Sequence, residues 1–287
     1  MADVRTVKLS DWGRMQIPGT LFCFAHRGYR ERATENTLEA IQHALEFDVD
    51  GIEIDIWNIG GQLLVKHDRR LGRLIAGSEL ITDLCPETLR EMLLPCGGRV
   101  PTLREVLEVV DNHAQLNIEL KGPNCAALVA AELESYVRDN GASFEQYLLS
   151  SFDHRQLYES LQLLPEVRRG VLIDGIPLDL AACAEPLKAY SLHLSLDFAD
   201  AEMIADGKRR GLKSYVFTVN STEDLHLMSA IGADGVFTDE PKLVMNYNAS
   251  KTAEVLMQQH LQPPEEMEGE PPAQVTTPAV SSQSGSV

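Results

Sequence analysis

FAHRG at residues 24–28, GIEIDIW at 51–57 and LLVKHD at 63–68 form the stretch from which the fold and the site can be inferred. The first two pieces are typical of short buried strands, and the third of a strand that returns beside the second. His26, Arg27, Glu53, Asp55 and His67 lie within or directly after these pieces. Ionisable side chains are costly to bury unless they are paired, bound to a metal or neutralised. So many of them where strands meet loops indicate a functional site.

The rest of the chain repeats strands and helices in alternation. The expected strands are residues 21–25, 51–57, 116–121, 147–151, 169–173, 191–196, 213–219 and 236–238. Eight strands that mostly alternate with helices predict an α/β fold, a TIM-type (β/α)8 barrel. A doubly wound open sheet is the alternative, and the absence of a GxGxxG sequence disfavours it.

Several helix ends have recognisable signals. Asn36 with Glu39, and Thr102 with Glu105, have the spacing of a capping box. Asn124 is expected to open a helix that ends near Gly141, and Ser221 to cap one that ends at Gly232.

One segment breaks the alternation after the second strand. Residues 58–62 include Gly60 and Gly61 and are too short for a parallel crossover, so residues 63–66 must return as a hairpin. Residues 67–99 then lack a regular pattern. We therefore expect one domain over residues 1–250 with an insertion at about 58–100. The acidic, Pro- and Ser-rich segment 262–287 is predicted to be a disordered tail.

Composition excludes several classes of protein. The 287 residues have a formal net charge of −18, which disfavours nucleic acid and anionic membrane surfaces as partners. No run of residues is apolar and long enough for a transmembrane helix, and the N-terminal segment lacks the apolar core of a signal peptide. Five scattered cysteines without CxxC spacing favour reduced thiols and a cytoplasmic location. Nothing in the sequence indicates an oligomeric state.

Carboxylates alternate with apolar residues on two of the expected strands. Glu53 and Asp55 share one face of the second strand, and Glu119 lies on the corresponding face of the third. A solvent-exposed antiparallel sheet would explain this pattern as well. In a barrel, however, helices cover the outer face, and the three carboxylates would converge at the mouth. There they would repel one another or share a hard, oxygen-liganded cation such as Mg²⁺ or Ca²⁺; zinc is disfavoured because no cysteine or paired-histidine spacing accompanies them.

Two histidines and two cations are expected at the same place. His26 follows the first strand and His67 the hairpin, which suits a general acid and a general base. Arg27 and Lys121 could simply pair with the carboxylates, or with a metal present could hold phosphate oxygens. A metal, two histidines and two cations together suit cleavage of a phosphoester. Among the other histidines, His193 alone lies on an expected strand and could reach the barrel interior.

The chain resembles the glycerophosphodiester phosphodiesterase family. The resemblance rests on HRG at 26–28, ENT at 35–37, GIEIDI at 51–56, HD at 67–68, PTLREVL at 101–107, IELK at 118–121, SSF at 150–152, FTVN at 217–220 and GVFTDEP at 235–241. Two positions differ from the family pattern: Thr34 stands where proline is usual, and Phe217 where tryptophan is usual. Phe217 could line the substrate pocket, so this difference bears on substrate preference.

The resemblance implies a barrel with a family-type insertion, a divalent metal ion on Glu53, Asp55 and Glu119, and His26 and His67 as the acid–base pair. It also implies that the substrate is a small glycerophosphodiester, hydrolysed to sn-glycerol 3-phosphate and an alcohol. One alternative is a lysophospholipase D-like activity, with an apolar groove supplied by residues 71–94. The other is a phosphodiester-binding scaffold without catalysis, against which the intact histidine pair argues.

Overall fold

The computed structural model describes residues 17–261. The predicted tail at 262–287 and the first part of the predicted domain, residues 1–16, lie outside the described residues.

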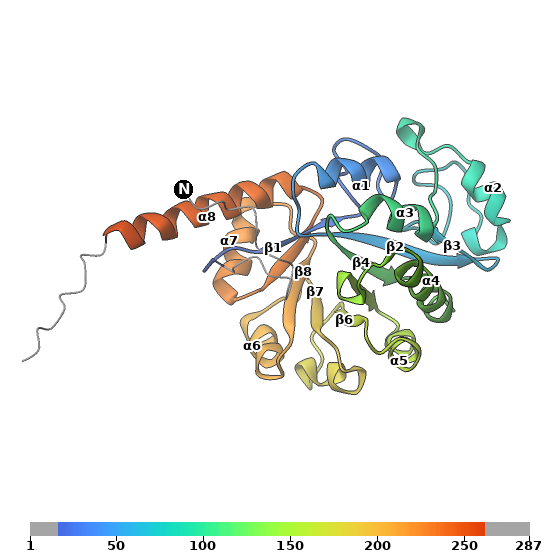
Figure 1. The fold of residues 1–287 in the computed structure, drawn as a ribbon. Coiled ribbons are helices and arrows are strands. Elements are labelled where there is room, and N and C mark those ends of the chain that lie inside the picture. Colours follow the sequence, from blue (N-terminus) through green and yellow to red (C-terminus); the bar gives the residue numbers. More distant parts are fainter. Residues whose placement is uncertain (1–16, 262–287) are drawn as a thin grey trace, which may run out of the picture.

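Eight parallel strands form a closed barrel (Figure 1). β1 pairs with both β2 and β9, and each other barrel strand pairs in parallel with its two neighbours. This closure confirms the predicted (β/α)8 barrel and excludes the open sheet. The barrel strands are β1 (Phe22–His26), β2 (Gly51–Ile59), β4 (Gln115–Leu120), β5 (Tyr147–Ser151), β6 (Arg168–Ile173), β7 (Ser191–Ser195), β8 (Lys213–Phe217) and β9 (Gly235–Thr238).

Helices surround the barrel because the outward residues of the strands are apolar. Ile52, Ile54 and Ile56 of β2 are buried in the main core together with Ile41 and Val106 of the covering helices. Glu53 and Asp55, which alternate with them, therefore face the barrel interior. The long helices are α1 (Leu38–Leu45), α3 (Leu103–Val110), α4 (Ala126–Asn140), α5 (His154–Leu163), α6 (Ala201–Arg209), α7 (Thr222–Ile231) and α8 (Pro241–Leu261). Between β6 and β7 the 3-10 helix η4 (Leu180–Leu187) takes the place of an α-helix, and η3 (Phe144–Gln146) is a single turn.

The predicted caps are correct at α3 and α7 and wrong at α1, whereas α4 ends at Gly141 as predicted but starts later than expected. Thr102 and Glu105 form the capping box of α3, and the Ser221 hydroxyl accepts from the Asp224 amide at the start of α7. Asn36 does not cap α1: its φ is +58°, and the hydroxyl of Thr37 accepts from the Ala40 amide instead. Asn124 likewise has a positive φ of +56°, and α4 begins two residues later.

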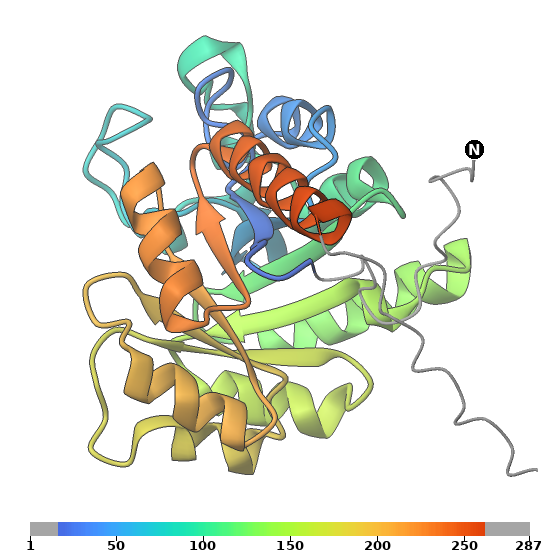
Figure 2. The same cartoon turned by 90° about the vertical axis from the view of Figure 1, so that its left-hand side faces the viewer.

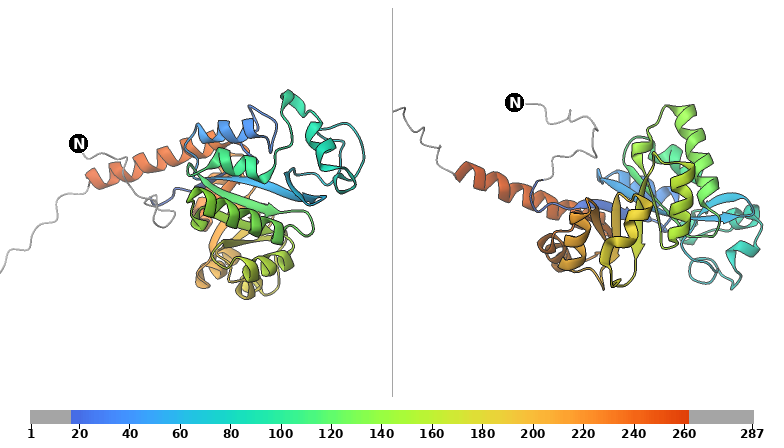
Figure 3. Two further views of the ribbon diagram at one scale, coloured as in Figure 1. Left: turned by 45° about the vertical axis from the view of Figure 1, so that its right-hand side comes forward. Right: turned by 90° about the horizontal axis from the view of Figure 1, so that it is seen from below.

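The insertion has its own small core. β3 (Gln62–Val65) pairs antiparallel with β2, which confirms the hairpin. Three short helices follow, η1 (Ile81–Asp83), α2 (Pro86–Glu91) and η2 (Pro95–Gly97), none of which the sequence pattern predicted. The segment lies at one side of the barrel, against the extended ends of β2 and β3 (Figure 3). Its core is formed by Trp57, Ile59, Leu64, Leu71, Ile75, Ile81, Leu89, Leu94 and Val100.

Aromatic side chains fill the lower part of the barrel interior. Phe24 of β1 and Phe237 of β9 stack with ring centroids 4.7 Å apart, and Tyr215 and Leu148 complete this cluster. On β1, β8 and β9 these residues precede the polar residues at the strand ends. The filled interior thus leaves the functional groups at the mouth, the usual site in this architecture.

The last helix runs past the predicted domain end at residue 250. α8 lies between α7 and α1 and extends to Leu261 beyond the barrel (Figure 2). Within residues 17–261, no helix is both long and apolar enough to cross a membrane.

Because the insertion has a packed core, we predict different effects on stability for alanine substitutions at two leucines that are four residues apart. Leu89 is fully buried and Leu93 is 62% exposed. Leu89→Ala should lower the free energy of unfolding by about 2–5 kcal/mol, whereas Leu93→Ala should change it by less than about 0.5 kcal/mol. Urea denaturation measures both, and equal effects would show that the insertion has no packed core.

Candidate active site

Glu53, Asp55 and Glu119 converge at the barrel mouth. One oxygen from each lies within 4.8 Å of the others, and all three side chains are buried. The parallel register of β2 and β4 produces this arrangement, since Asp55 pairs with Glu119. The surface-sheet interpretation of the alternating acids does not apply to these strands.

Burial and mutual proximity shift the pKa values of the three carboxyl groups. Burial, with the charges of Asp55 and Glu119, raises the pKa of Glu53 well above its usual range. Burial and the neighbouring Asp55 raise the pKa of Glu119 to about 7. Burial would also raise the pKa of Asp55, but Lys121 and Arg27 outweigh it and lower that pKa to about 2. In addition, Glu53 Oε1 is buried without a hydrogen-bond partner. When all three groups are ionised, the cluster therefore has an excess of negative charge, which either protons or a bound cation would balance.

Arg27 and Lys121 lie against this cluster. Arg27 Nε is 3.2 Å from Asp55 Oδ2, and the Arg27 amide donates to Glu53 Oε2 at 3.1 Å. Lys121 Nζ lies 2.9 Å from Glu119 Oε1 and 3.3 Å from Asp55 Oδ1. Both cations thus pair with carboxylates here, as the simpler interpretation expected.

His26 is held by a carboxylate from the opposite end of the chain. Its Nδ1 lies 2.8 Å from Asp239 Oδ1, which also accepts from Arg30 Nη1 at 2.7 Å. Asn220 Nδ2 donates to the other oxygen of Asp239 at 2.9 Å. Burial lowers the pKa of His26, and the hydrogen bond to Asp239 opposes that shift.

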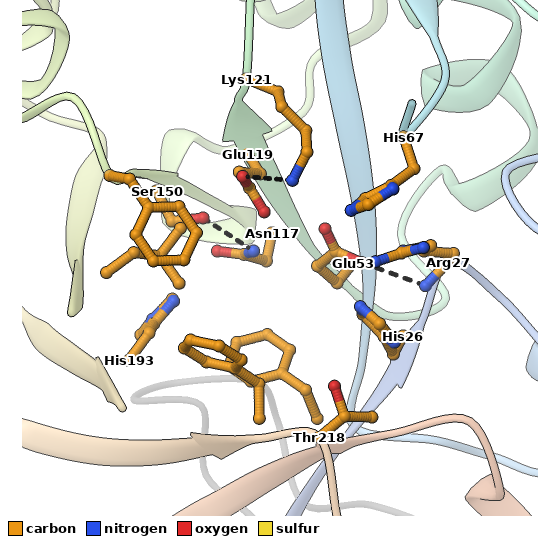
Figure 4. Close-up of a pocket in the computed structure, with 14 residues that line it drawn as sticks. His26, Arg27, Glu53, His67, Asn117, Glu119, Lys121, Ser150, His193 and Thr218 are labelled. Carbon is orange, nitrogen blue, oxygen red and sulfur yellow. Dashed lines mark hydrogen bonds and ion pairs between the residues drawn. The ribbon is translucent and has the colours of Figure 1, made fainter. Parts of the chain in front are cut away.

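His67 is held in a similar way. Its Nδ1 lies 2.9 Å from Asp68 Oδ1, and Asp68 Oδ2 accepts from Arg73 Nε at 2.8 Å. Burial lowers the pKa of His67, and the charge of Asp55 opposes that shift. Since Nδ1 is engaged in both histidines, Nε2 is the ring nitrogen that each can offer to a ligand. Figure 4 shows the two rings on the same side of the cavity, next to Glu53.

A cavity of about 160 Å³ joins these groups. Phe217 and Phe152 pack edge to face beside it, with ring centroids 5.9 Å apart. All of the predicted site residues except Asp55 line the cavity. The lining residues are His26, Arg27, Glu53, His67, Asn117, Glu119, Lys121, Ser150, Phe152, Leu172, His193, Phe217, Thr218 and Phe237.

Sequence reasoning assigned no role in the site to several residues that support it, although they lie in the motifs quoted above. Asn36, expected as a helix cap, instead donates from Nδ2 to Asp55 Oδ2 at 2.8 Å. Asp239 and Asp68 each hold a histidine. Their signal was position: Asp239 directly follows the last strand and Asp68 directly follows His67. Glu35 joins the two halves of the site, because it pairs with Arg27 at 3.0 Å and with Arg73 at 2.9 Å.

Comparison with known proteins gives a consistent result. The sequence profile of the glycerophosphoryl diester phosphodiesterase family matches residues 26–243. A glycerophosphodiester phosphodiesterase of Caldanaerobacter subterraneus is 30% identical over 236 residues, covering 77% of this chain and 95% of the relative. One of Bacillus altitudinis is 31% identical, covering 76% of this chain and 94% of the relative.

Solved structures share the fold. An Oleispira antarctica phosphodiesterase, solved in complex with the product sn-glycerol-3-phosphate, matches with a TM-score of 0.70 and 28% identity, covering 78% of this chain and 95% of that chain. A protein of Silicibacter pomeroyi matches with a TM-score of 0.73 at 21% identity, covering 81% of this chain and 94% of that chain, which shows the fold alone.

From the carboxylate cluster we predict that a substitution of Glu53 raises the stability of the metal-free protein and weakens the binding of a divalent cation. In EDTA at neutral pH, Glu53→Gln should be more stable than the wild type, because it removes a carboxyl group whose ionised form is disfavoured by burial and by the neighbouring carboxylates. With Mg²⁺ or Ca²⁺ at 100 times Kd the wild type should gain about 2.7 kcal/mol, and the variant should gain less. Urea denaturation with and without the ion measures both effects.

Asp206→Asn is the matched control for this prediction. Asp206 is also a buried carboxylate, but it is paired with Arg210 at 2.8 Å. Its substitution should destabilise the protein and leave the response to the ion unchanged. A Glu53→Gln variant that behaves in the same way would contradict the prediction.

Proposed function

The chain belongs to the glycerophosphoryl diester phosphodiesterase family, and we propose that it hydrolyses glycerophosphodiesters to sn-glycerol 3-phosphate and an alcohol. One observation carries the proposal: two histidines, each held through Nδ1 by a carboxylate, share a small cavity with Arg27, Lys121 and an acidic cluster.

Glu53, Asp55 and Glu119 are proposed to hold one divalent cation, Mg²⁺ or Ca²⁺. Three features of the residues fit such an ion: all donors are carboxylate oxygens, Glu53 Oε1 is buried without a hydrogen-bond partner, and the pKa of Glu53 and of Glu119 is raised. When bound, the ion would supply charge that stabilises the phosphorus oxygens in the transition state.

Arg27 and Lys121 are proposed to bind the non-bridging oxygens of the phosphate. Both now pair with carboxylates of the cluster. If that negative charge is balanced, the guanidinium and the ammonium can turn part of their hydrogen-bonding capacity to an anionic substrate.

The two histidines are proposed to move protons at Nε2. Asp239 and Asp68 accept from Nδ1, which fixes the tautomer and leaves Nε2 directed at the substrate. One ring, neutral, takes the proton of the hydroxyl group whose oxygen forms a new bond to phosphorus. The other ring, protonated, gives its proton to the alkoxide as the bond between phosphorus and the departing alcohol breaks.

The structure does not support the apolar groove that the lysophospholipase D alternative requires of residues 71–94. The large apolar residues of segment 71–94 mostly pack in the insertion core, and only Leu93 among its leucines and isoleucines is strongly exposed. A cavity of about 160 Å³ is also small beside the roughly 300–1,000 Å³ of sites for drug-sized ligands. Both facts favour a substrate whose glycerol carries no acyl chain.

We also propose a cytoplasmic location for the enzyme. Its support is that Cys85, Cys125 and Cys183 form no disulfide within the part of the chain that the structure describes, as expected in a reducing compartment. Cell fractionation that found the protein outside the cytoplasm would contradict this proposal.

The first functional prediction concerns catalysis. Release of sn-glycerol 3-phosphate from glycerophosphocholine should stop in EDTA and return with excess Mg²⁺ or Ca²⁺. His26→Ala and His67→Ala should each lower kcat by about 10²–10⁴-fold, and the double variant little further, because the two act as a unit. His43→Ala, on the surface of α1, is the control. Wild-type activity in His26→Ala would refute the assignment.

The second concerns the substrate class. Wild-type enzyme should cleave glycerophosphocholine with a higher kcat/KM than lysophosphatidylcholine, which has the same head group but carries an acyl chain on its glycerol. A preference for lysophosphatidylcholine, measured below its micelle concentration, would instead support the lysophospholipase D activity.

A further inference from the structure

Three buried polar residues line the inner end of the cavity. They are Asn117 of β4, Ser150 of β5 and His193 of β7, with exposed fractions of 1%, 0% and 0%. Asn117 lies two residues before Glu119 on its strand and pairs in register with Glu53 of β2, so it lies deeper in the barrel than Glu119. We call these three residues the polar floor (Figure 4).

Two atoms of the polar floor have no hydrogen-bond partner among the described residues. Asn117 Nδ2 donates to Ser150 Oγ at 3.0 Å, but Asn117 Oδ1 is unpaired. His193 Nε2 lies 2.9 Å from Ser191 Oγ, but His193 Nδ1 is unpaired. A buried polar atom without a partner costs about 1–3 kcal/mol, and native proteins rarely retain two in one place without a reason.

The fold provides space specifically for the histidine of the floor. A Cβ at Gly170 would lie 2.4 Å from His193 Nε2, so β6 can only have glycine beside this ring. Burial also lowers the pKa of His193 to about 3, so the ring is neutral. A neutral imidazole has one donor and one acceptor nitrogen, which suits a hydroxyl group rather than an anion.

The cavity has two different ends. The polar floor is closed, while Phe152 at the other end is 47% exposed and packs on Phe217. A glycerophosphodiester also has two ends, a small glycerol that never varies and an alcohol that does. With phosphate at Arg27 and Lys121, the closed end suits the glycerol and the open end the variable alcohol.

We propose that Asn117 Oδ1 and His193 Nδ1 bind the glycerol hydroxyl farthest from the phosphate, and that the polar floor thereby selects glycerol over less hydroxylated alcohols. This inference rests on the proposed function and assigns the specificity-determining residues of the same site. In this assignment the hydroxyl group donates to Asn117 Oδ1 and accepts from the Nδ1–H of the neutral His193 ring, so both atoms gain the partner that they lack among the described residues.

The test compares glycerophosphocholine with its analogue that lacks only that distal hydroxyl. A site built to bind a hydroxyl group rejects the compound without it, because its polar atoms stay unpaired. Wild-type kcat/KM should fall by at least about 100-fold on the analogue. This arm requires no mutation, so it does not depend on whether a variant folds.

Two variants then test whether Asn117 and His193 are the residues that distinguish the two substrates. Asn117→Leu and His193→Phe keep the approximate shape and remove the polar atom, so each should reduce the ratio of the two kcat/KM values to less than about 10, with the loss confined to glycerophosphocholine. Phe152→Leu, at the open end, should keep the wild-type ratio. Equal losses on both substrates would mean that the floor is only structural and would overturn the proposal.

A binding measurement separates this proposal from the proposed function. By calorimetry, wild-type protein with Mg²⁺ should bind sn-glycerol 3-phosphate at least about 10-fold more tightly than 1,2-propanediol 1-phosphate. If no glycerophosphodiester is hydrolysed but this preference holds, the proposed function fails and the polar floor stands. Equal binding, or equal wild-type turnover of the two diesters, would overturn the polar-floor proposal.

Discussion

Repulsion among Glu53, Asp55 and Glu119 is the constraint to which the rest of the site responds. Three carboxylates within 4.8 Å of one another, all buried, cannot all stay ionised without nearby positive charge. Arg27 and Lys121 supply part of it. The negative charge that remains when all three are ionised makes the cluster a good site for a divalent cation and a poor structural element without one. This is the usual relation between a functional site and stability, in which local cost is tolerated because the surrounding fold compensates for it.

The barrel and its insertion are what hold this cluster together with the two histidines. Closure brings Asp239, at the end of the last strand, to within 2.8 Å of His26 on the first. The insertion contributes Arg73, which pairs with Glu35 and so ties the His67 side of the site to the Arg27 side. Rigid strands position the acids, and a chain of ion pairs across the mouth positions the bases, which is the kind of preorganisation that catalysis by proton transfer requires.

Much of this could be predicted from the sequence because it depends on local periodicity. Strand alternation predicted that Glu53 and Asp55 share a face, and a five-residue connection predicted the hairpin. Features that depend on closure or on backbone conformation could not be predicted in this way. The contact of Asp239 with His26 joins residues 213 apart, and Asn36 resembles a helix cap until its positive φ turns its amide towards Asp55. The unpaired atoms of Asn117 and His193 are visible only once β4 and β7 face each other across the barrel.

The central claim is that one divalent cation balances the three buried carboxylates beside the bound phosphate. The most direct test is anomalous diffraction from crystals grown with Mn²⁺ and sn-glycerol 3-phosphate. We predict a single strong peak within coordination distance of Glu53, Asp55 and Glu119, with the phosphate next to it. A map without a peak among these carboxylates, or with the ion bound elsewhere, would contradict the account.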